Sequence, residues 1–238
     1  MTEPSAPATS SPELQIPFSH FVRFVRQLSH DLRNHLNAAE LQSAFIAEIA
    51  EDPEVKAEVK RLRSMVSQTG TALQQLTTTL AAVNLTSMPY PAADFIEDFR
   101  QKFDAAFPER TADVSWQVSL PSGAMLEIDP QLLQPALLEL FANAFSHGRG
   151  SGVISATAAM QGDSFELAIH EPKTTFDQPT GDWGRKPLRA VRGGHYGLGL
   201  HRTRTILEAH DGQLRADFDP KASSLVTTVR LPVKLNSA

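Results

Sequence analysis

The chain contains no cysteine, which excludes disulfide bonds and zinc sites built from cysteine thiolates. This absence is typical of proteins in a reducing compartment. Basic residues are not in excess either: 27 acidic side chains against 22 Lys and Arg give a net charge of −5, with no basic block. Binding to nucleic acid needs a basic patch or stripe, so no nucleic-acid partner is expected.

The sequence also has no long apolar run. A membrane-spanning helix needs about 18 or more apolar residues in succession. The longest candidate, residues 132–145, is interrupted by Gln134, Pro135, Glu139 and Asn143. The N-terminus has no basic stretch followed by an apolar core, so it does not have the pattern of a signal peptide. We therefore expect a cytoplasmic protein without membrane insertion.

The composition is that of a globular protein, with 41% hydrophobic and 21% charged residues, and the length suggests one or two domains. Residues 1–17 are rich in Pro, Ser, Thr and Ala and are interpreted as a disordered tail, so no sensory domain is expected before residue 18. The remaining organisation is predicted as a helical hairpin at 18–84, a linker at 85–91 and a second domain at 92–235.

Two long helical patterns are separated by Asp52 and Pro53, where the proline suits the first turn of a new helix. The first pattern covers about 18–50, and its seam also follows alternating steps of three and four, at Val22, Val25, Ser29, Leu32, Leu36 and Ala39. The second repeats an apolar residue in alternating steps of four and three from Val55 to Val83, which is a heptad pattern. One hairpin cannot cover both apolar seams. A homodimer in which two hairpins form a four-helix bundle is therefore predicted, although a hairpin with no chemistry would show the same seams.

The first helix contains the sequence LSHDLRNHL, which places His30, Asp31 and Asn34 together. At about 100° per residue, His30 and Asn34 lie one turn apart on one face, and His30 points roughly 130° away from the apolar seam. An exposed histidine beside a carboxylate suits a nucleophile that meets a phosphoryl donor from outside. The alternative is a surface histidine of a charged helix.

The second domain alternates helical and strand patterns. Helices are predicted at about 92–107, with a stripe of phenylalanines, at about 129–147, and after residues 197–200 to about 209. Strands are predicted at 114–120, 125–128, 152–159, 164–170, 213–218 and 224–231, the last two as a hairpin. Residues 171–196 have no period and are interpreted as a long functional loop. The domain is expected to be α+β, with helices on one face of a mixed or antiparallel sheet.

Three motifs, in this order, resemble the catalytic core of sensor histidine kinases. FVRQLSHDLRNHL resembles the phosphoacceptor motif of the dimerisation and histidine-phosphotransfer domain. DPQLLQPALLELFANAFSHG resembles the N-box of GHKL ATP-binding domains, and GGHYGLGL resembles their glycine-rich motif. The resemblance covers roughly residues 18–235. It implies an antiparallel helical hairpin that dimerises into a four-helix bundle, followed by an α/β-sandwich Bergerat (GHKL) domain.

The resemblance also implies roles for individual residues. His30 would be phosphorylated, Asp31 would orient it and take part in proton transfer, and Asn34 would position water for dephosphorylation of the partner. Asn143 would coordinate Mg²⁺ together with the phosphates of ATP, and an amide oxygen suits that ion. The implied nucleotide contacts are Glu139, Asn143, His147, Glu171, Gly194, Gly197, Leu198 and Gly199. Glu139 and Ser146 stand where asparagine and lysine are common in the family.

One motif of the family is damaged. Where the family carries Asp-x-Gly-x-Gly, this chain has Glu171, then Lys173 and Thr175 at the two glycine positions. Glu171 would replace the acid that accepts a hydrogen bond from the adenine amino group. Side chains at the glycine positions are expected to crowd the nucleotide or misplace the loop 171–196, which would close over ATP as a lid.

The resemblance implies two candidate functions. The first is an ATP-dependent histidine kinase that phosphorylates His30 and passes the group to an aspartate of a response-regulator receiver domain, with phosphatase activity as a further implication. The second is a kinase-like phosphotransferase that has lost ATP binding and relays phosphoryl groups between receivers, which the damaged motif favours. A GHKL ATPase of another kind is a third alternative, against which the His30 helix and the paired seams argue. A scaffold without activity is a fourth, which the absence of activity in assays of both candidate functions would favour.

Overall fold

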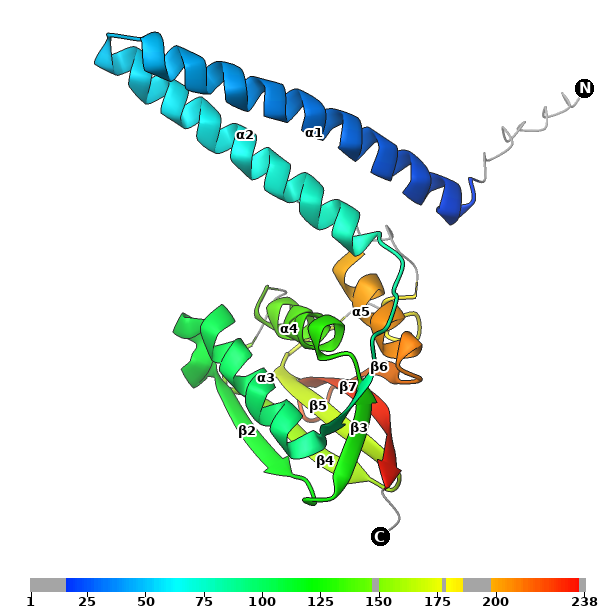
Figure 1. Ribbon diagram of the computed structural model, residues 1–238. Helices are drawn as coiled ribbons and strands as arrows, with labels where there is room; N and C mark the ends of the chain where they lie inside the picture. Colours follow the sequence, from blue (N-terminus) through cyan, green and yellow to red (C-terminus); the bar gives the residue numbers. More distant parts are fainter. Residues whose placement is uncertain (1–15, 147–149, 177–178, 186–197, 236–238) are drawn as a thin grey trace, which may run out of the picture. The chain divides into compact units, whose positions relative to one another are not determined.

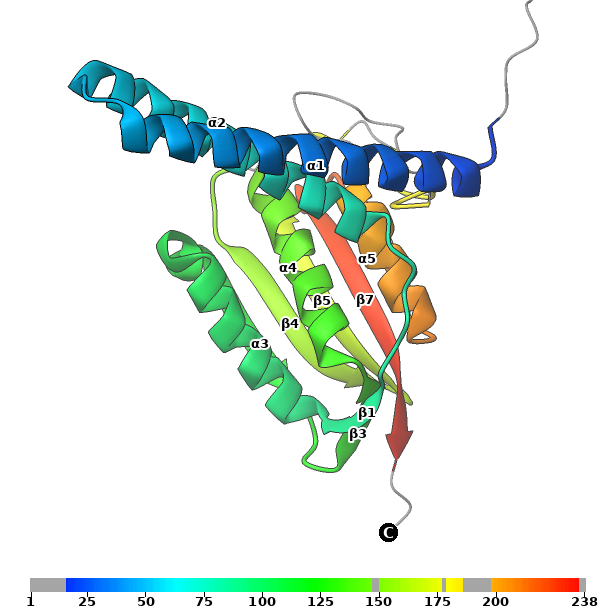
Figure 2. The same cartoon turned by 45° about the horizontal axis from the view of Figure 1, so that its top comes forward.

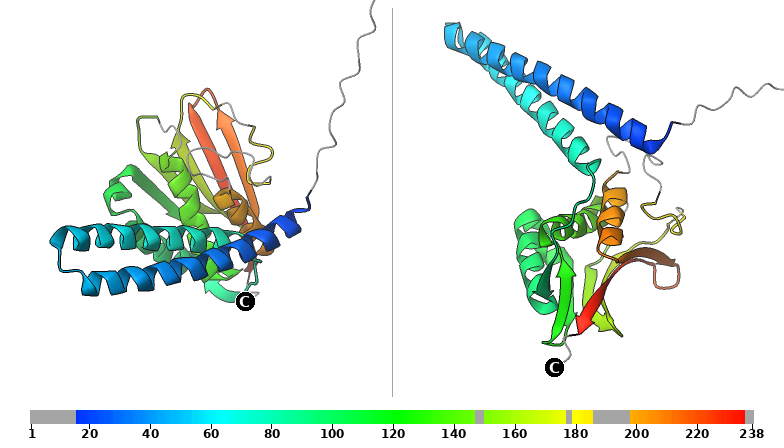
Figure 3. Two further views of the ribbon diagram at one scale, coloured as in Figure 1. Left: turned by 90° about the horizontal axis from the view of Figure 1, so that it is seen from above. Right: turned by 45° about the vertical axis from the view of Figure 1, so that its right-hand side comes forward.

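The computed structural model describes residues 16–146, 150–176, 179–185 and 198–235. The chain divides into two compact units, Met1–Ala81 and Ala82–Ala238. The first unit is an antiparallel pair of helices, α1 (Phe18–Ile49) and α2 (Pro53–Thr79), joined by a short turn (Figure 1). The two views of Figure 3 show these helices side by side along most of their length.

The turn between the helices forms where the sequence predicts it. The carboxylate of Asp52 accepts a hydrogen bond from the backbone N–H of Glu54 at 2.8 Å, and Pro53 occupies the first helical position. This arrangement satisfies a backbone donor that the first turn of a helix leaves free, and proline loses nothing there because its missing N–H has no helical partner. The cap therefore determines where α2 begins.

The seam between α1 and α2 is narrow and partly polar. Its buried residues in α1 are Val25, Ser29 and Ser43, and α2 contributes Val59. Polar contacts cross the rim of the seam: Arg33 donates to Gln74 at 2.5 Å, and the Arg63 guanidinium lies 3.0 Å from a Glu40 oxygen. Leu32, which the heptad pattern places in the seam, is 39% exposed.

The second unit contains four helical segments and seven strands among the described residues. In chain order these are β1 (Met88–Pro91), α3 (Ala92–Ala106), the 3₁₀ helix η1 (Pro108–Asp113), β2 (Val114–Ser119), β3 (Ala124–Ile128), α4 (Pro130–Ser146), β4 (Ile154–Gln161), β5 (Ser164–Pro172), α5 (Leu198–Ala209), β6 (Gln213–Asp219) and β7 (Ser224–Leu235).

The strands form one mixed sheet in the order β1-β3-β7-β5-β4-β2, and β6 also pairs with β7. The β2–β4 pair is parallel, whereas the other pairs are antiparallel. Figure 2 shows α3, α4 and α5 on the same face of the sheet. The structure is therefore an α/β sandwich, which confirms the predicted fold of this part of the chain.

The core lies between the helices and the sheet. Phe95, Phe99 and Phe103 of α3 are completely buried, as the predicted stripe requires. Phe103 packs edge-on against Trp116 of β2 at 5.7 Å and against Phe141 of α4 at 4.9 Å between ring centroids. Edge-to-face packing of this kind adds to the free energy gained from burying the rings.

The predicted linker at 85–91 is too long. Met88–Pro91 forms strand β1, which pairs with β3 so that Met88 lies opposite Ile128. Two prolines obscured this strand, because proline lacks the N–H that a sheet interior needs. In this sheet β1 is an edge strand, where prolines are tolerated. The segment that connects α2 to the sheet is correspondingly shorter than predicted.

The predicted loop 171–196 also begins too early. Strand β5 continues through Glu171 and Pro172, which pair with Leu225 and Ser224 of β7. The proposed lid therefore starts no earlier than Lys173. Residues 177–178 and 186–197 of this loop lie outside the described residues.

Candidate functional site

The first candidate site is the exposed face of α1 around His30. The side chain of His30 is 68% exposed, as the helical geometry predicts. Its Nδ1 atom lies 3.2 Å from an Oδ1 of Asp31 and 3.5 Å from the amide nitrogen of Asn34. The same Asp31 oxygen accepts a hydrogen bond from Gln27 at 2.9 Å. The structure thus brings the three predicted catalytic residues together.

The contact with Asp31 determines which nitrogen of the neutral His30 ring carries the proton. A carboxylate oxygen can only accept, so the shorter contact requires a proton on Nδ1. The lone pair of the neutral imidazole is then on Nε2, the nitrogen farther from the helix.

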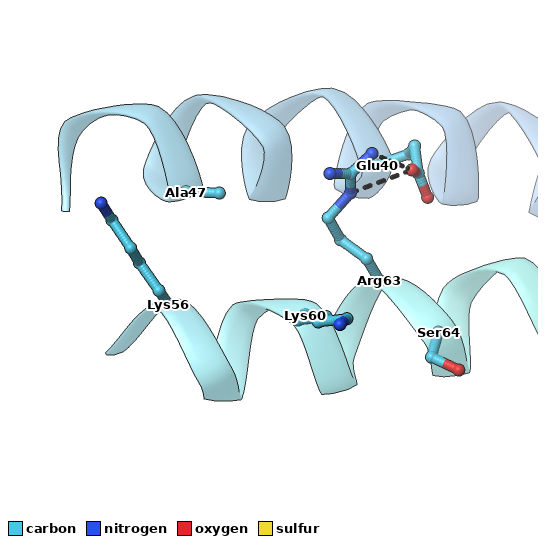
Figure 4. A pocket seen from close by; sticks show the side chains of 6 residues that line it. All are labelled: Glu40, Ala47, Lys56, Lys60, Arg63 and Ser64. Atoms are coloured by element: carbon cyan, nitrogen blue, oxygen red, sulfur yellow. Dashed lines mark hydrogen bonds and ion pairs between the residues drawn. The ribbon is translucent and has the colours of Figure 1, made fainter. Parts of the chain in front are cut away.

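A shallow groove lies elsewhere on the hairpin, between α1 and α2 (Figure 4). It has a volume of about 500 Å³ and is lined by Glu40, Ala47, Lys56, Lys60, Arg63 and Ser64. Figure 4 shows Arg63 reaching across to Glu40, whereas the two lysines project from α2. The groove carries three cations and one carboxylate. Three cations on an exposed helix form no recognisable motif, so the sequence carries no signal for this groove.

The second candidate site lies where α4 and α5 meet. Glu139 and Asn143 are one turn apart on α4, both half-buried, and the Asn143 amide lies 3.5 Å from Glu139 Oε1. Leu198 is buried at the start of α5, and a Cβ on Gly199 would lie only 2.0 Å from Glu139 Oε1. Glycine at 199 therefore allows α5 to approach Glu139.

The remaining residues of the predicted nucleotide site divide into two groups. His147, Gly194 and Gly197 lie outside the described residues. Ser146 is described and exposed, and its hydroxyl donates to the carbonyl of Ala142 at 2.7 Å. That hydrogen bond satisfies the hydroxyl locally and leaves it a weak substitute for a lysine that would contact phosphate.

Glu171 is the most altered of the predicted contacts. Its Oε1 atom lies 2.6 Å from Nζ of Lys173, and the two residues are only 5% and 6% exposed. The carboxylate is therefore held by a cation of the same chain. The sequence predicted crowding by Lys173, but it did not predict that Lys173 would bind Glu171.

The ligands available for Mg²⁺ are the amide oxygen of Asn143 and the carboxylate of Glu139. Oxygen ligands of this kind suit Mg²⁺, which usually retains several waters and binds together with substrate phosphates. No cluster of three or more His, Cys, Asp or Glu that could hold a metal by itself is present in the described part of the chain. The residues on α4 thus fit a metal that is delivered with a phosphate ligand.

The buried Arg204 of α5 connects its helix to two other segments of the second unit, and the sequence did not predict this role. Arg204 donates to the carbonyls of Trp183 at 2.5 Å and Leu214 at 2.6 Å. Burial lowers the pKa of Arg204, and its hydrogen bond with Glu208 acts in the opposite direction. Because only tertiary contacts bring these carbonyls together, the sequence carries no signal for this role.

Sequence comparison finds related histidine kinases, although no family model matches the chain. The sensor-like histidine kinase SenX3 of Mycobacterium tuberculosis is 27% identical over 225 residues, a match that covers 86% of this chain and 52% of SenX3. SenX3 of Mycobacterium bovis matches to the same extent. The chain therefore spans about half the length of the curated relatives it matches.

Comparison of structures shows the same architecture. Full-length ShkA in complex with AMPPNP matches 91% of this chain and 47% of its own, with a TM-score of 0.66 and 17% identity. ThkA in complex with the response regulator protein TrrA matches 93% and 64% of the two chains, with a TM-score of 0.55 and 15% identity. Both have the fold of a helical hairpin followed by a mixed α/β sandwich. Within the described ranges, this chain has no helix with the length and apolarity to span a membrane.

Proposed function

We propose that this chain carries a phosphoryl group on His30 in two-component signalling. The chain resembles a histidine kinase catalytic core, which combines a phosphoacceptor hairpin with a GHKL-type ATP-binding domain. The phosphoryl group is then passed to an aspartate of a response-regulator receiver domain. The observation that supports this most directly is the exposed imidazole of His30 with its Nδ1 held by Asp31. An exposed Nε2 can meet a donor carried by another domain.

The transfer at His30 follows from this geometry. Nε2 attacks the phosphorus atom, the N–P bond forms, and the O–P bond to the leaving group breaks. Asp31 stabilises the charged ring, because Nδ1–H remains hydrogen-bonded to its carboxylate while positive charge develops. In the reverse direction, a receiver aspartate takes the group and the neutral imidazole is restored. We assign to Asn34 the positioning of water when the partner is dephosphorylated.

ATP is the first candidate donor. Asn143 and Glu139 provide oxygen ligands on α4, and Gly199 lets α5 approach them. We assign the metal role to Asn143 and nucleotide contacts to Glu139, Leu198 and Gly199 in this proposal, with His147, Gly194 and Gly197 assigned by resemblance alone. Mg²⁺, when bound with ATP, supplies neutralisation of the phosphate charge.

A phosphorylated receiver is the second candidate donor, and one observation favours it. The carboxylate expected to recognise adenine is bound to Lys173 at 2.6 Å. A chain that does not bind ATP would still relay phosphoryl groups through His30, because that chemistry needs only the hairpin and two receivers. The two donors lead to different predictions in one assay.

The assay measures acid-labile label on the protein. The chain is incubated with γ-labelled ATP and Mg²⁺, and separately with a labelled phospho-receiver. His30→Gln is expected to remove the label in whichever reaction gives it. His35→Gln changes another exposed histidine of α1 and is expected to keep the label. Label from ATP supports the kinase, and label from the receiver alone supports the relay. Label from neither, with both units folded, contradicts the proposal.

We further propose that the hairpin forms a homodimer. Large apolar side chains remain exposed on the hairpin, and they include Phe24, Leu28, Leu32, Ile46, Leu62 and Met65. An apolar surface of this extent on two amphipathic helices is typical of a protein interface. Packing against the same surface of a second copy would bury it as a four-helix bundle.

A further inference from the structure

Glu171 and Lys173 form a buried ion pair in the second unit. Lys173 Nζ lies 2.6 Å from Glu171 Oε1 and 5.3 Å from the ring centroid of Phe176. Both charged residues are about 95% buried. A buried carboxylate needs a partner that supplies positive charge or hydrogen-bond donors, and here the chain itself supplies one.

The backbone around Lys173 is also held on both sides. The N–H of Lys173 donates to the carbonyl of Ser223 at 2.7 Å, and the N–H of Gly150 donates to the carbonyl of Pro172 at 2.8 Å. The first bond continues the β5–β7 ladder past its last pair, and the second joins the end of β5 to the segment before β4. Together they hold the backbone from which the side chain of Lys173 reaches Glu171.

The second of the two replaced glycine positions differs from the first in its exposure to solvent. Thr175, which stands at the second glycine position of the family motif, is exposed. Only Lys173 of the two replacements directs its side chain into the protein interior. The sequence predicts that both side chains interfere with a nucleotide. In the structure only Lys173 turns its side chain toward Glu171, so only Lys173 is positioned to interfere there.

We propose that Lys173 determines the specificity of the nucleotide site, because its ammonium occupies the acceptor on Glu171 that the amino group of adenine would use. This inference rests on the proposed function only in taking Glu171 as the base-recognition acid. An adenine amino group at Glu171 would compete with the ammonium for the carboxylate, and displacing the ammonium would leave it buried without a partner, which is strongly unfavourable. The adenine amino group therefore contributes little affinity while Lys173 is present.

The test is a calorimetric titration of the full chain with AMPPNP and Mg²⁺. Lys173→Met keeps the length of the stem beside Phe176 and removes the ammonium. It is expected to raise the affinity for AMPPNP about tenfold or more, because a hydrogen bond to a charged acceptor becomes available. The guanine analogue GMPPNP, which has a carbonyl where adenine has its amino group, is expected to gain nothing. An unchanged affinity for AMPPNP in a folded Lys173→Met protein contradicts the proposal.

Two further variants serve as controls. Thr175→Gly restores the other family glycine and is expected to leave the affinity for AMPPNP unchanged. Glu171→Gln combined with Lys173→Met keeps the volume of the pair and removes both charges, so the gain seen in Lys173→Met should disappear. A gain as large in either control would show that relief of crowding, and not release of Glu171, is responsible.

The unaltered protein gives an independent result if Lys173→Met does not fold. ATP is compared with purine riboside triphosphate, which lacks the 6-amino group. The two nucleotides are expected to bind equally, or both to fall below detection. A clear preference for ATP contradicts the proposal. Because these titrations measure binding alone, a failure of His30 to carry label would contradict the proposed function and leave this result unaffected.

Discussion

At the residue scale, Asp129 connects three parts of the second unit. Its Oδ1 accepts from the N–H groups of Gln131 and Leu132 and so caps α4, while Oδ2 accepts from Thr86 at 2.9 Å. Its own N–H donates to Nε2 of His210 at 2.9 Å, at the end of α5. The sequence predicted the cap, but the contacts with Thr86 and His210 come from distant parts of the chain.

Replacing Asp129 with alanine is expected to lower the free energy of unfolding of the second unit by about 2–4 kcal/mol. The variant loses the helix cap supplied by the buried Asp129 and leaves the N–H of Thr86 without its acceptor in a part-buried hydrogen bond. Both tryptophans, Trp116 and Trp183, lie in this unit, so urea denaturation followed by tryptophan fluorescence measures the change.

Asp52→Ala is the matched control, because Asp52 also caps a helix but is exposed and lies in the hairpin. It is expected to destabilise the hairpin by about 1 kcal/mol, measured from its helical circular dichroism signal, and to leave the tryptophan transition in place. A similar shift of the tryptophan transition in both variants would refute the role given to Asp129.

Tyr90 on β1 provides a prediction about pH. Its hydroxyl donates a hydrogen bond to the carboxylate of Asp98, which, together with burial and the negative charges of Asp98 and Asp94, raises the pKa of Tyr90 above its usual value. Folding thus favours the protonated phenol. Its contribution to stability is complete below the pKa of the unfolded chain, near 10, and is lost as pH rises through the raised pKa of the folded state.

The stability of the second unit is therefore expected to decline as pH rises above about 10, the ordinary pKa of tyrosine, and through the raised pKa of Tyr90 in the folded state. Tyr90→Phe should make that decline shallower. Urea midpoints by tryptophan fluorescence across this range provide the measurement. Equal slopes for the two proteins would show that the hydrogen bond with Asp98 does not contribute to folding.

At the element scale, the contact between α4 and α5 depends on Glu139 and Gly199. A methyl group at 199 would lie 2.0 Å from Glu139 Oε1 and 2.6 Å from its Cδ. The carboxylate would have to rotate away and would lose its contact with Asn143. The side chains of α4 and α5 are thus matched in size at this point.

This contact predicts that the effect of Gly199→Ala depends on the residue at 139. With Glu139 present, the displaced carboxylate offsets the better helix propensity of alanine, and the variant is neutral or destabilised. In a Glu139→Ala background, Gly199→Ala should stabilise the unit by about 0.5–1 kcal/mol. A double-mutant cycle from urea denaturation measures the coupling, and additive effects would refute the contact.

At the scale of the whole molecule, the hairpin is expected to determine the oligomeric state. Leu62→Asp places a charge on the exposed apolar surface of α2 and should convert the dimer into a monomer. Ser67→Asp changes an exposed residue five positions later, about 140° round the helix, and should leave the dimer intact. Sedimentation at micromolar concentration distinguishes the two, and a monomer before any substitution contradicts the dimer.

Local pattern predicted much of the fold. Heptad steps identified α1 and α2, the cap at Asp52 and Pro53 located their turn, and the phenylalanine stripe identified α3 and its buried face. The exposure of His30 was also predictable from the sequence, because the position of a side chain around a single helix depends only on its spacing from the seam.

Long-range pairing decided the rest. Met88–Pro91 became a strand because β3 was available beside it, although its prolines predicted a linker. The sheet order joins strands that are distant in sequence, and local periodicity contains no information about partners.

By itself, the sequence determined the helices, most of their exposed and buried faces, and the exposed position of His30 beside Asp31, since each depends on neighbours within a few residues. Only the tertiary structure decided that Lys173 turns inward to Glu171 while Thr175 remains exposed. The orientation of a side chain at the end of a strand depends on its surroundings. For Lys173 the surroundings are the ring of Phe176 and the start of strand β7, which pairs with the end of β5. Spacing along the chain does not specify either contact.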